Sequence, residues 1–368
     1  MTNLRVLCVG IPGSGRDPYI EGMIKIANNE EKEVSYYHIF DHIVQKASDE
    51  GFKIHKLNIL DVFLTRPDRI RTFRVAAIDD IGKKMANKQG VHIISTPYHF
   101  EWKGASLEGL TDSEIKKLNP DIFIAIIDDV ARVKERLKKD SQWCEHQFTF
   151  GEIARWRREE IKGIWDHAHS FKPPREVFIL AIEHNPRVFY DLIFEGKKKK
   201  VYLSYPITGV TPEIIRQVRE FKQEMGKYYV VFDPLTIHDW KIVEHWQTAK
   251  NSQQGLPDVF KCRIDYESGS IEYECNSKEI EFAIKDIRRQ IVDRDYKMID
   301  SSEYVIVYHP RRSISAGVVC EMVHGKGGGK MVYAMYPFEP SPFFEYHANR
   351  IFKNEMEFTN FLKKIAEP

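Results

Sequence analysis

The sequence has few of the features that mark metal-binding, disulfide-stabilised or secreted proteins. Its 368 residues include five cysteines, and no two of them form a CxxC pair of the kind that binds zinc. We therefore expect free thiols, no metal centre and a reducing, cytoplasmic location. Residues 4–9 already read as an apolar strand, and no signal-peptide pattern precedes them.

No charge of one sign dominates the chain, and no apolar run is long. The 55 lysines and arginines nearly balance the 54 acidic residues, so the net charge of +1 gives no reason to expect nucleic acid as a partner. The apolar runs are too short to span a bilayer, so we expect no membrane partner. The lysine run at residues 197–200 is interpreted as a solvated linker. The length is sufficient for two domains, each with its own core.

A short buried strand and the helix after it form the most informative stretch of the sequence. Residues 304–308, YVIVY, are continuously apolar, which is typical of a strand covered on both faces of a parallel sheet. Ser315 is the predicted N-cap of the next helix, with Gly317 in its first turn and Glu321 one turn further on. Ligands bind outside the carboxyl ends of such strands. A carboxylate there can attack an anomeric carbon or stabilise an oxocarbenium-like transition state.

An ordered set of residues in the C-terminal half resembles the nucleoside 2-deoxyribosyltransferase superfamily. The set comprises the opening segment VYLSYPIT at 201–208, Arg294-Asp295, the strand 304–308, Ser315-Ala316-Gly317 and Glu321. The resemblance covers roughly residues 198–340. It implies a glycosyl-transferring or glycosidic-cleaving domain that needs no cofactor.

The same resemblance implies roles for individual residues. Glu321 matches the nucleophile of the family, and the alternative is an ordinary solvated helix carboxylate. Tyr202 matches a tyrosine that hydrogen-bonds the nucleophile, although simple packing would also explain it. Asp295 is the second carboxylate, expected to act on the leaving group or on the sugar hydroxyls. The expected substrate-binding residues lie at strand ends and at the helix start; they are Ser204, Pro206, Asp233, Ser315 and Gly317. A helix N-terminus could receive a 5′-phosphate if the substrate is a nucleotide.

The N-terminal half opens with a strand and a glycine-rich loop. Residues 10–17, GIPGSGRD, have the glycine spacing of a phosphate-binding P-loop. Arg16 replaces the lysine of that motif, and Asp17 replaces the hydroxyl that would hold Mg²⁺. The expected nucleotide-binding residues all belong to this loop; they are Gly10, Gly13, Ser14, Gly15 and Arg16. The alternative is a tight strand-to-helix connection that binds no ligand.

Residues 4–185 resemble archaeal-type adenylate kinases. Residues 91–97 match a strand that in these kinases normally ends in an aspartate near the metal, and this sequence has Ser95 at that place. Phosphoryl transfer depends on neutralisation of charge by lysine and Mg²⁺. The three replacements, Arg16, Asp17 and Ser95, therefore favour nucleotide binding over kinase activity.

The sequence as a whole predicts an α/β protein with two doubly wound parallel-sheet domains. Residues 1–195 are expected to form a kinase-like P-loop domain, and residues 198–368 a deoxyribosyltransferase-like domain. The expected function is N-glycosidic cleavage or transfer on a nucleoside, a nucleotide or an NAD-like substrate. The alternatives are a non-catalytic nucleotide sensor or scaffold, and a weak nucleotide kinase. A nucleotide bound by the first domain is the one additional ligand that the pattern suggests.

Aromatic residues gather near the C-terminal end, at 336–338 and 343–346. Such a cluster either packs against its own sheet or forms a contact between subunits. Because tyrosine and phenylalanine are enriched at interface cores, we expect a homo-oligomer, most simply a two-fold dimer.

Overall fold

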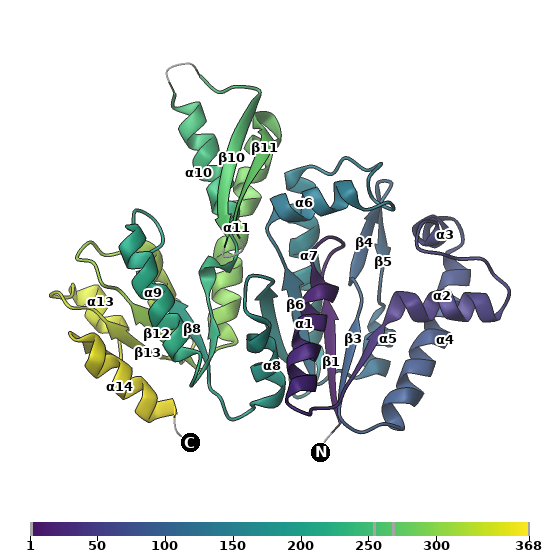
Figure 1. The fold of residues 1–368 in the computed structure, drawn as a ribbon, viewed down its shortest axis with the longest axis horizontal. Coiled ribbons are helices and arrows are strands. Elements are labelled where there is room, and N and C mark those ends of the chain that lie inside the picture. Colours follow the sequence, from purple (N-terminus) through teal and green to yellow (C-terminus); the bar gives the residue numbers. More distant parts are fainter. Residues whose placement is uncertain (1–2, 253–254, 267–268, 367–368) are drawn as a thin grey trace. The chain divides into compact units, whose positions relative to one another are not determined.

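The computed structural model describes residues 3–252, 255–266 and 269–366, which form two compact units. Unit 1 comprises Met1–Glu183 and Ile237–Gln290, and unit 2 comprises His184–Thr236 and Ile291–Pro368. Each unit contains one five-stranded parallel sheet with helices, so the predicted α/β class with two parallel sheets is confirmed (Figure 1). None of the described helices is long and apolar enough to cross a membrane.

The sheet of unit 1 has the strand order β2-β3-β1-β6-β7, with all neighbours parallel. Its strands are β1 (Leu4–Val9), β2 (Val34–His38), β3 (Val91–Ser95), β6 (Ile122–Ile127) and β7 (Glu176–Ala181). Every residue of β3 and β6 is buried, as expected for inner strands covered on both faces. Strand β1, predicted at residues 4–9, is confirmed.

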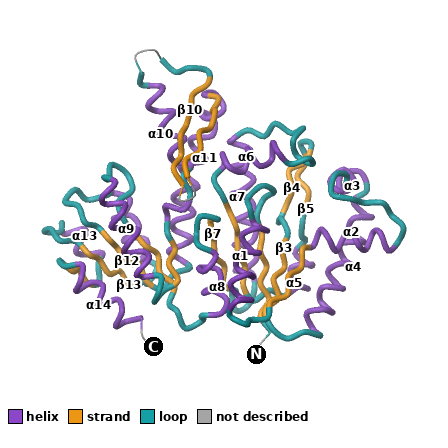
Figure 2. Tube along the Cα trace, viewed as in Figure 1, coloured by secondary structure: helices purple, strands orange, loops and turns teal. Residues whose placement is uncertain are grey.

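Helices alternate with these strands, as Figure 2 shows. The helices of unit 1 are α1 (Arg16–Asn29), α2 (Ile39–Asp49), α3 (Ile59–Thr65), α4 (Pro67–Ala86), α5 (Asp112–Leu118), α6 (Val130–Lys139), α7 (Phe150–Ser170) and α10 (Asp239–Lys250). Two antiparallel hairpins complete it: β4 (His99–Trp102) with β5 (Ala105–Glu108), and β10 (Val259–Tyr266) with β11 (Gly269–Asn276). Helix α11 (Ser277–Asp300) begins in unit 1, and the division between the units falls within it.

The sheet of unit 2 has the parallel order β14-β13-β12-β8-β9. Its strands are β8 (Lys200–Ser204), β9 (Val230–Phe232), β12 (Tyr304–Tyr308), β13 (Met331–Met335) and β14 (Arg350–Phe352). Its helices are α8 (Pro186–Phe194), α9 (Pro212–Met225), α12 (Ala316–Gly327), α13 (Pro342–His347) and α14 (Glu355–Ala366), with a 3₁₀ turn η1 (Pro234–Thr236). The central strand β12 and the helix after Ser315 lie where the sequence predicts them.

The compact units do not follow the expected boundary at residues 195–198. Helix α8 packs against β9, so residues from His184 onward belong to unit 2. The segment 237–290 interrupts unit 2 in sequence but packs within unit 1. The cause of this second difference is a group of buried charges far apart in sequence.

Two aspartates of this group cap each other's helices. Asp129, at the start of α6, accepts a hydrogen bond from the backbone N–H of His238 at 2.5 Å. Asp239, at the start of α10, accepts one from the backbone N–H of Val130 at 2.9 Å. The guanidinium of Arg157 lies 2.6 Å from the second oxygen of Asp239, and both side chains are almost fully buried. Helix starts carry unsatisfied N–H groups, so this exchange fixes α10 to the sheet end of unit 1.

The close approach of α12 to β12 positions the helix that carries Glu321. A Cβ added to Gly325 would lie 2.6 Å from Cγ2 of Val305, so the Val305 side chain, the helix or the strand would have to shift. Residues four apart share one face of a helix, so Glu321 lies on the same sheet-facing side as Gly325, one turn earlier. The glycine therefore sets the distance between Glu321 and the strands.

We expect Gly325→Ala to push α12 away from β12. Overpacking of this kind costs about 1–3 kcal/mol of the free energy of unfolding. Gly327→Ala is the matched control, because a Cβ at Gly327 meets nothing within 4 Å. Urea unfolding of both variants would test this, and equal stability of the two would contradict it.

Candidate active site

Glu321 is held by two hydroxyl groups of strand β8. The hydroxyl of Tyr202 donates a hydrogen bond to Oε1 of Glu321 at 3.0 Å, and the hydroxyl of Ser204 donates one to Oε2. Tyr202 and Ser204 are two residues apart on one strand, so their side chains emerge on the same face of the sheet. Both are fully buried. The carboxyl group is thus fixed in one orientation by groups that carry no formal charge.

The ionisation of Glu321 is strongly perturbed. Burial raises the pKa of Glu321 to about 8, and the negative charge of Asp295 acts in the same direction. Hydrogen bonds from Ser204 and Tyr202, and more weakly the charge of Arg294, oppose this rise. Among the described residues, Glu321 has no lysine, arginine or histidine within ion-pair distance. A raised pKa in a carboxyl group without a cationic partner is a property of functional sites.

Asp295, on helix α11, is the second acid of the site. It is 7% exposed, and its Oδ1 accepts hydrogen bonds from Nε and Nη2 of Arg294 at 3.0 and 2.8 Å. Arg294 also donates to the carbonyl of Pro234 at 2.8 Å, so its guanidinium has a fixed position. Burial raises the pKa of Asp295, while Arg294 opposes that rise. The charge of Asp295 acts on both Glu321 and Tyr202, so the three predicted catalytic residues lie together.

The side chains of two predicted substrate-binding residues, Ser204 and Asp233, make hydrogen bonds to other residues of the protein. Ser204 is bonded to Glu321, as described above. Asp233, which follows β9, accepts hydrogen bonds from Tyr205 at 2.6 Å and from Lys222 at 2.8 Å. Burial disfavours the charge of Asp233, but Lys222 and Tyr205 outweigh it and lower the pKa to about 2. Pro206, in the loop after β8, is buried. These residues shape the site, and their contact with substrate stays a prediction.

The start of α12 is open. Ser315 is its N-cap residue, as predicted, but the Ser315 side chain makes no capping hydrogen bond. Gly317 is exposed, and a Cβ added to it would have only the Ser315 hydroxyl nearby, at 3.7 Å. The first-turn amides therefore carry no capping side chain, which leaves this helix N-terminus suited to an anionic group.

His309 is a residue of the site that sequence reasoning missed. It is fully buried at the end of β12, and its Nε2 accepts a hydrogen bond from the backbone N–H of Ser315 at 3.2 Å. Since Nε2 must be an acceptor, Nδ1 carries the proton and donates it to the carbonyl of Arg311 at 3.0 Å. Burial lowers the pKa of His309, in agreement with this neutral form. A single histidine after an apolar strand gives no sequence signal for such a role.

The glycine-rich loop of unit 1 is filled by its own side chains. Arg16 is 7% exposed and folds back, with Nη1 donating to the carbonyl of Gly10 at 2.8 Å. Its Nε lies 2.9 Å from Oδ1 of Asp17. Gly13 and Gly15 both have φ of +78°, a conformation that favours glycine. Ser14 is 1% exposed, and its hydroxyl has no hydrogen-bond partner among the described residues.

The three positions that depart from the kinase pattern contact one another. Asp17 accepts hydrogen bonds from Ser95 at 2.8 Å and from Tyr36 at 2.9 Å, in addition to its pair with Arg16. Burial disfavours the charge of Asp17, but Arg16 and the other partners hold its pKa well below the usual range. The charge of Arg16 is thus already balanced inside the loop. Binding of a nucleotide by these residues stays a prediction.

Comparison with known proteins gives no family for the chain. No protein-family model matches it, and no curated protein matches it. Among solved structures, the crystal structure of TT1252 from Thermus thermophilus is similar with a TM-score of 0.31 and 9% sequence identity. The match covers 49% of this chain and 89% of that chain. A similarity at this level assigns neither a fold family nor a function.

The raised pKa of Glu321 predicts a stability change with pH. A carboxyl group whose pKa is higher in the folded state stabilises the fold below its unfolded value of 4.5, and that stability is lost as pH rises through about 8. Glu321→Gln should therefore be most stabilising, relative to the parent, above pH 8. The difference is at most a few kcal/mol, since one pKa unit corresponds to about 1.4 kcal/mol.

Chemical unfolding of the parent and the variant at a series of pH values would test this. Glu339→Gln is the control, because the Glu339 side chain is 94% exposed. Parallel pH profiles for the parent and Glu321→Gln would show that Glu321 ionises normally.

Proposed function

We propose that unit 2 cleaves or transfers the N-glycosidic bond of a nucleoside, a nucleotide or an NAD-like compound, with Glu321 as the nucleophile. The observation that carries this proposal is the Glu321 carboxyl group, oriented by the Tyr202 and Ser204 hydroxyls and lacking a cationic partner in the described chain. Glu321 lies on the helix that follows β12 and bonds to two residues of the neighbouring strand β8. Parallel sheets bind ligands outside the carboxyl ends of their strands. The carboxyl group is therefore poised near the expected position of a sugar carbon.

The proposed step exchanges one bond of the sugar for another. An oxygen of Glu321 bonds to the anomeric carbon as the carbon–nitrogen bond breaks, and the proton of the Glu321 carboxyl passes to the leaving base. Water or a second base then takes the sugar from Glu321 and returns the proton to the carboxyl group. Tyr202 and Ser204 keep the reacting oxygens aligned throughout.

Asp295 has a different task, because Arg294 favours its charged form. An ionised carboxylate accepts hydrogen bonds from sugar hydroxyls and stabilises positive charge that develops on the ring. Its charge also keeps Glu321 protonated until substrate binds. The open N-terminus of α12, at Ser315 and Gly317, would receive a 5′-phosphate where the substrate carries one.

For unit 1 we infer at most nucleotide binding without phosphoryl transfer. The supporting observation is the Arg16–Asp17 pair, which balances the positive charge that a P-loop presents to phosphate. Ser95 donates to Asp17 and supplies no carboxylate for a metal.

Replacement of the two acids should separate their tasks. Glu321→Gln should reduce release of free base from a panel of nucleosides, nucleotides and NAD by at least about a thousandfold, since the covalent step is removed. Asp295→Asn should retain some turnover and shift the falling limb of kcat/KM to lower pH, because protonated Glu321 is the reactive form and the charge that raises its pKa is gone.

Chromatographic detection of free base across a pH series measures both effects, with Glu339→Gln as the exposed control. Turnover close to that of the parent in Glu321→Gln, on a substrate that the parent cleaves, would exclude Glu321 as the nucleophile. An unchanged pH profile in Asp295→Asn would show that Asp295 does not raise the pKa of Glu321.

We also propose a homodimer formed through α13. The C-terminal aromatic cluster divides in two: Tyr336 and Phe344 are buried within unit 2, whereas Phe343 is 76% exposed and Tyr346 is 71% exposed. The buried pair packs against His309, with ring centroids 5.3 and 6.1 Å from its ring. The exposed pair remains available to a second copy of the chain.

Light scattering should return a mass of about twice 43.2 kDa for the parent at micromolar concentration. Joint replacement of Phe343 and Tyr346 by serine should give the monomer mass. Phe282→Ser is the control, since Phe282 is 85% exposed but lies in unit 1. A single 43.2 kDa species for the parent at all concentrations would exclude the dimer.

A further inference from the structure

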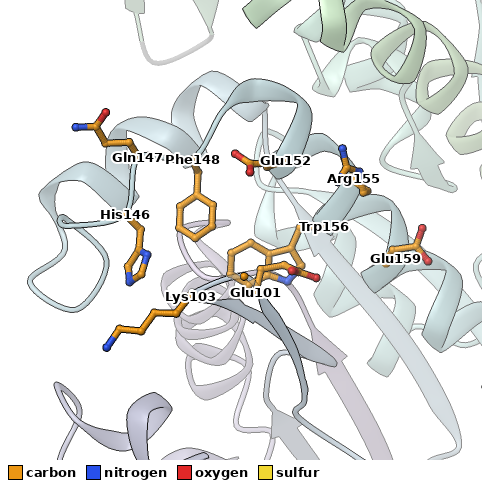
Figure 3. A pocket seen from close by; sticks show the side chains of 10 residues that line it. Glu101, Lys103, His146, Gln147, Phe148, Glu152, Arg155, Trp156 and Glu159 are labelled. Carbon is orange, nitrogen blue, oxygen red and sulfur yellow. The ribbon is translucent and has the colours of Figure 1, made fainter. Parts of the chain in front are cut away.

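A pocket of about 390 Å³ in unit 1, between the β4–β5 hairpin and the first turns of α7, is lined by side chains that already have partners (Figure 3). Glu152 accepts hydrogen bonds from the backbone N–H and the hydroxyl of Thr149, both at 2.8 Å. Glu159 lies 3.2 Å from Arg158, and Trp156 is 1% exposed. The observed contacts of this lining therefore select no class of ligand.

The candidate active site of unit 2, by contrast, contains a polar group that the proposed reaction has not used, the hydroxyl of Tyr296. Tyr296 follows Asp295 directly on helix α11 and is half-buried. Its hydroxyl makes no hydrogen bond to another residue of the described chain. Burial raises the pKa of Tyr296, and Cys320, Glu321 and Asp295 act in the same direction, so the hydroxyl lies near both acids. It therefore remains protonated and can act as a hydrogen-bond donor.

The ring of Tyr296 is held in place by His324 of helix α12. The two rings are stacked, with centroids 4.0 Å apart and planes inclined by 2°. Nε2 of His324 lies 2.8 Å from Oδ1 of Asp300, which is one turn after Tyr296 on α11. His324 is three residues after Glu321, so the two side chains lie on neighbouring turns of one side of α12. This contact therefore fixes the Tyr296 ring relative to the helix that carries Glu321.

The substrate must reach Glu321 from the side away from strand β8. Tyr202 and Ser204 are fully buried on β8, and each bonds one oxygen of the Glu321 carboxyl group. A leaving group departs from the face of the sugar carbon opposite to the attacking oxygen. The departing base therefore lies further from β8 than the sugar does, on the open side where half-buried Tyr296 and exposed Cys320 lie.

We propose that Tyr296 is a further catalytic residue, whose hydroxyl donates a hydrogen bond to a ring nitrogen or carbonyl oxygen of the departing nucleobase. This inference rests on the proposed glycosidic function and narrows its substrate class. A purine or pyrimidine that takes the electron pair of the carbon–nitrogen bond becomes negatively charged unless a donor stabilises it. The hydroxyl of Tyr296 stabilises that charge while the proton of Glu321 passes to the base, and no bond to Tyr296 forms or breaks.

Nicotinamide differs from these bases as a leaving group. It departs from a positively charged pyridinium ring as a neutral molecule, so it develops no negative charge for a donor to stabilise. A donor at Tyr296 therefore favours purine or pyrimidine nucleosides and nucleotides over NAD-like substrates.

The dependence on the leaving group separates this role from a structural one. Tyr296→Phe retains the ring but removes the donor. It should lower kcat/KM at least about tenfold for purine and pyrimidine nucleosides or their 5′-monophosphates, and less than about twofold for release of nicotinamide from NAD. Free base is measured chromatographically for ribosyl and 2′-deoxyribosyl substrates of each kind.

Two further variants complete the experiment. His324→Ala removes the stacked ring and should give a smaller loss with the same dependence on the leaving group. Tyr228→Phe should leave all rates unchanged, because Tyr228 is also half-buried in unit 2 but precedes β9, at the amino ends of the strands. Thermal melts establish that each variant is folded, and Tyr296→Phe alone decides the question if His324→Ala is not.

The outcomes distinguish this inference from the proposed function. Unchanged rates in Tyr296→Phe, or an equal loss for purine, pyrimidine and nicotinamide release, would overturn the role of Tyr296 and leave that of Glu321 intact. Cleavage of NAD alone by the parent would also overturn it, since nicotinamide requires no donor. A parent that releases no base from any of these compounds would overturn the proposed function, and this inference with it.

Discussion

The contact between helix α12 and the sheet of unit 2 is the constraint on which the site depends. Gly325 allows the helix to approach Val305, and the same face of the helix then brings Glu321 to the hydroxyls of Tyr202 and Ser204. Neither hydroxyl carries a charge, so the carboxyl group is oriented without an ion pair. The same two hydrogen bonds therefore fix the position of the carboxyl group that we propose as the nucleophile.

The acids of unit 2 differ in what compensates their burial. Asp233 is paired with Lys222 and has a pKa lowered to about 2, whereas Glu321 has a pKa raised to about 8. Burial also raises the pKa of Asp295, and Arg294 only partly offsets that rise. In unit 1, Asp17 and Asp239 have arginine partners at 2.9 and 2.6 Å. Of these five acids, Glu321 is the one without a cation within ion-pair distance, and a perturbed carboxyl group of this kind is a candidate for a functional site.

Sequence patterns predicted the elements that depend on local periodicity. The strand at residues 304–308, the helix start at Ser315 and the strand at residues 4–9 were all identified from apolar runs and capping residues. The position of segment 237–290 in unit 1 was not predicted, because it depends on the ion pair between Asp239 and Arg157, which are far apart in the sequence. Such pairs leave no periodic signal. His309 was missed for the same reason, because its role depends on its hydrogen bonds to the Arg311 carbonyl and the Ser315 amide, which the sequence does not reveal.

The histidine explains why the open helix start can persist. A helix N-terminus without a capping side chain leaves amides unsatisfied, and Ser315 does not cap α12. His309 instead bonds the Ser315 amide and the Arg311 carbonyl, so the loop is held from beneath by a buried ring. Tyr336 and Phe344 pack against that ring, and Tyr336 also donates to the carbonyl of Arg312 at 2.8 Å. Because the loop is fixed from the interior, the outer face of the helix start, including Gly317, stays free for a ligand.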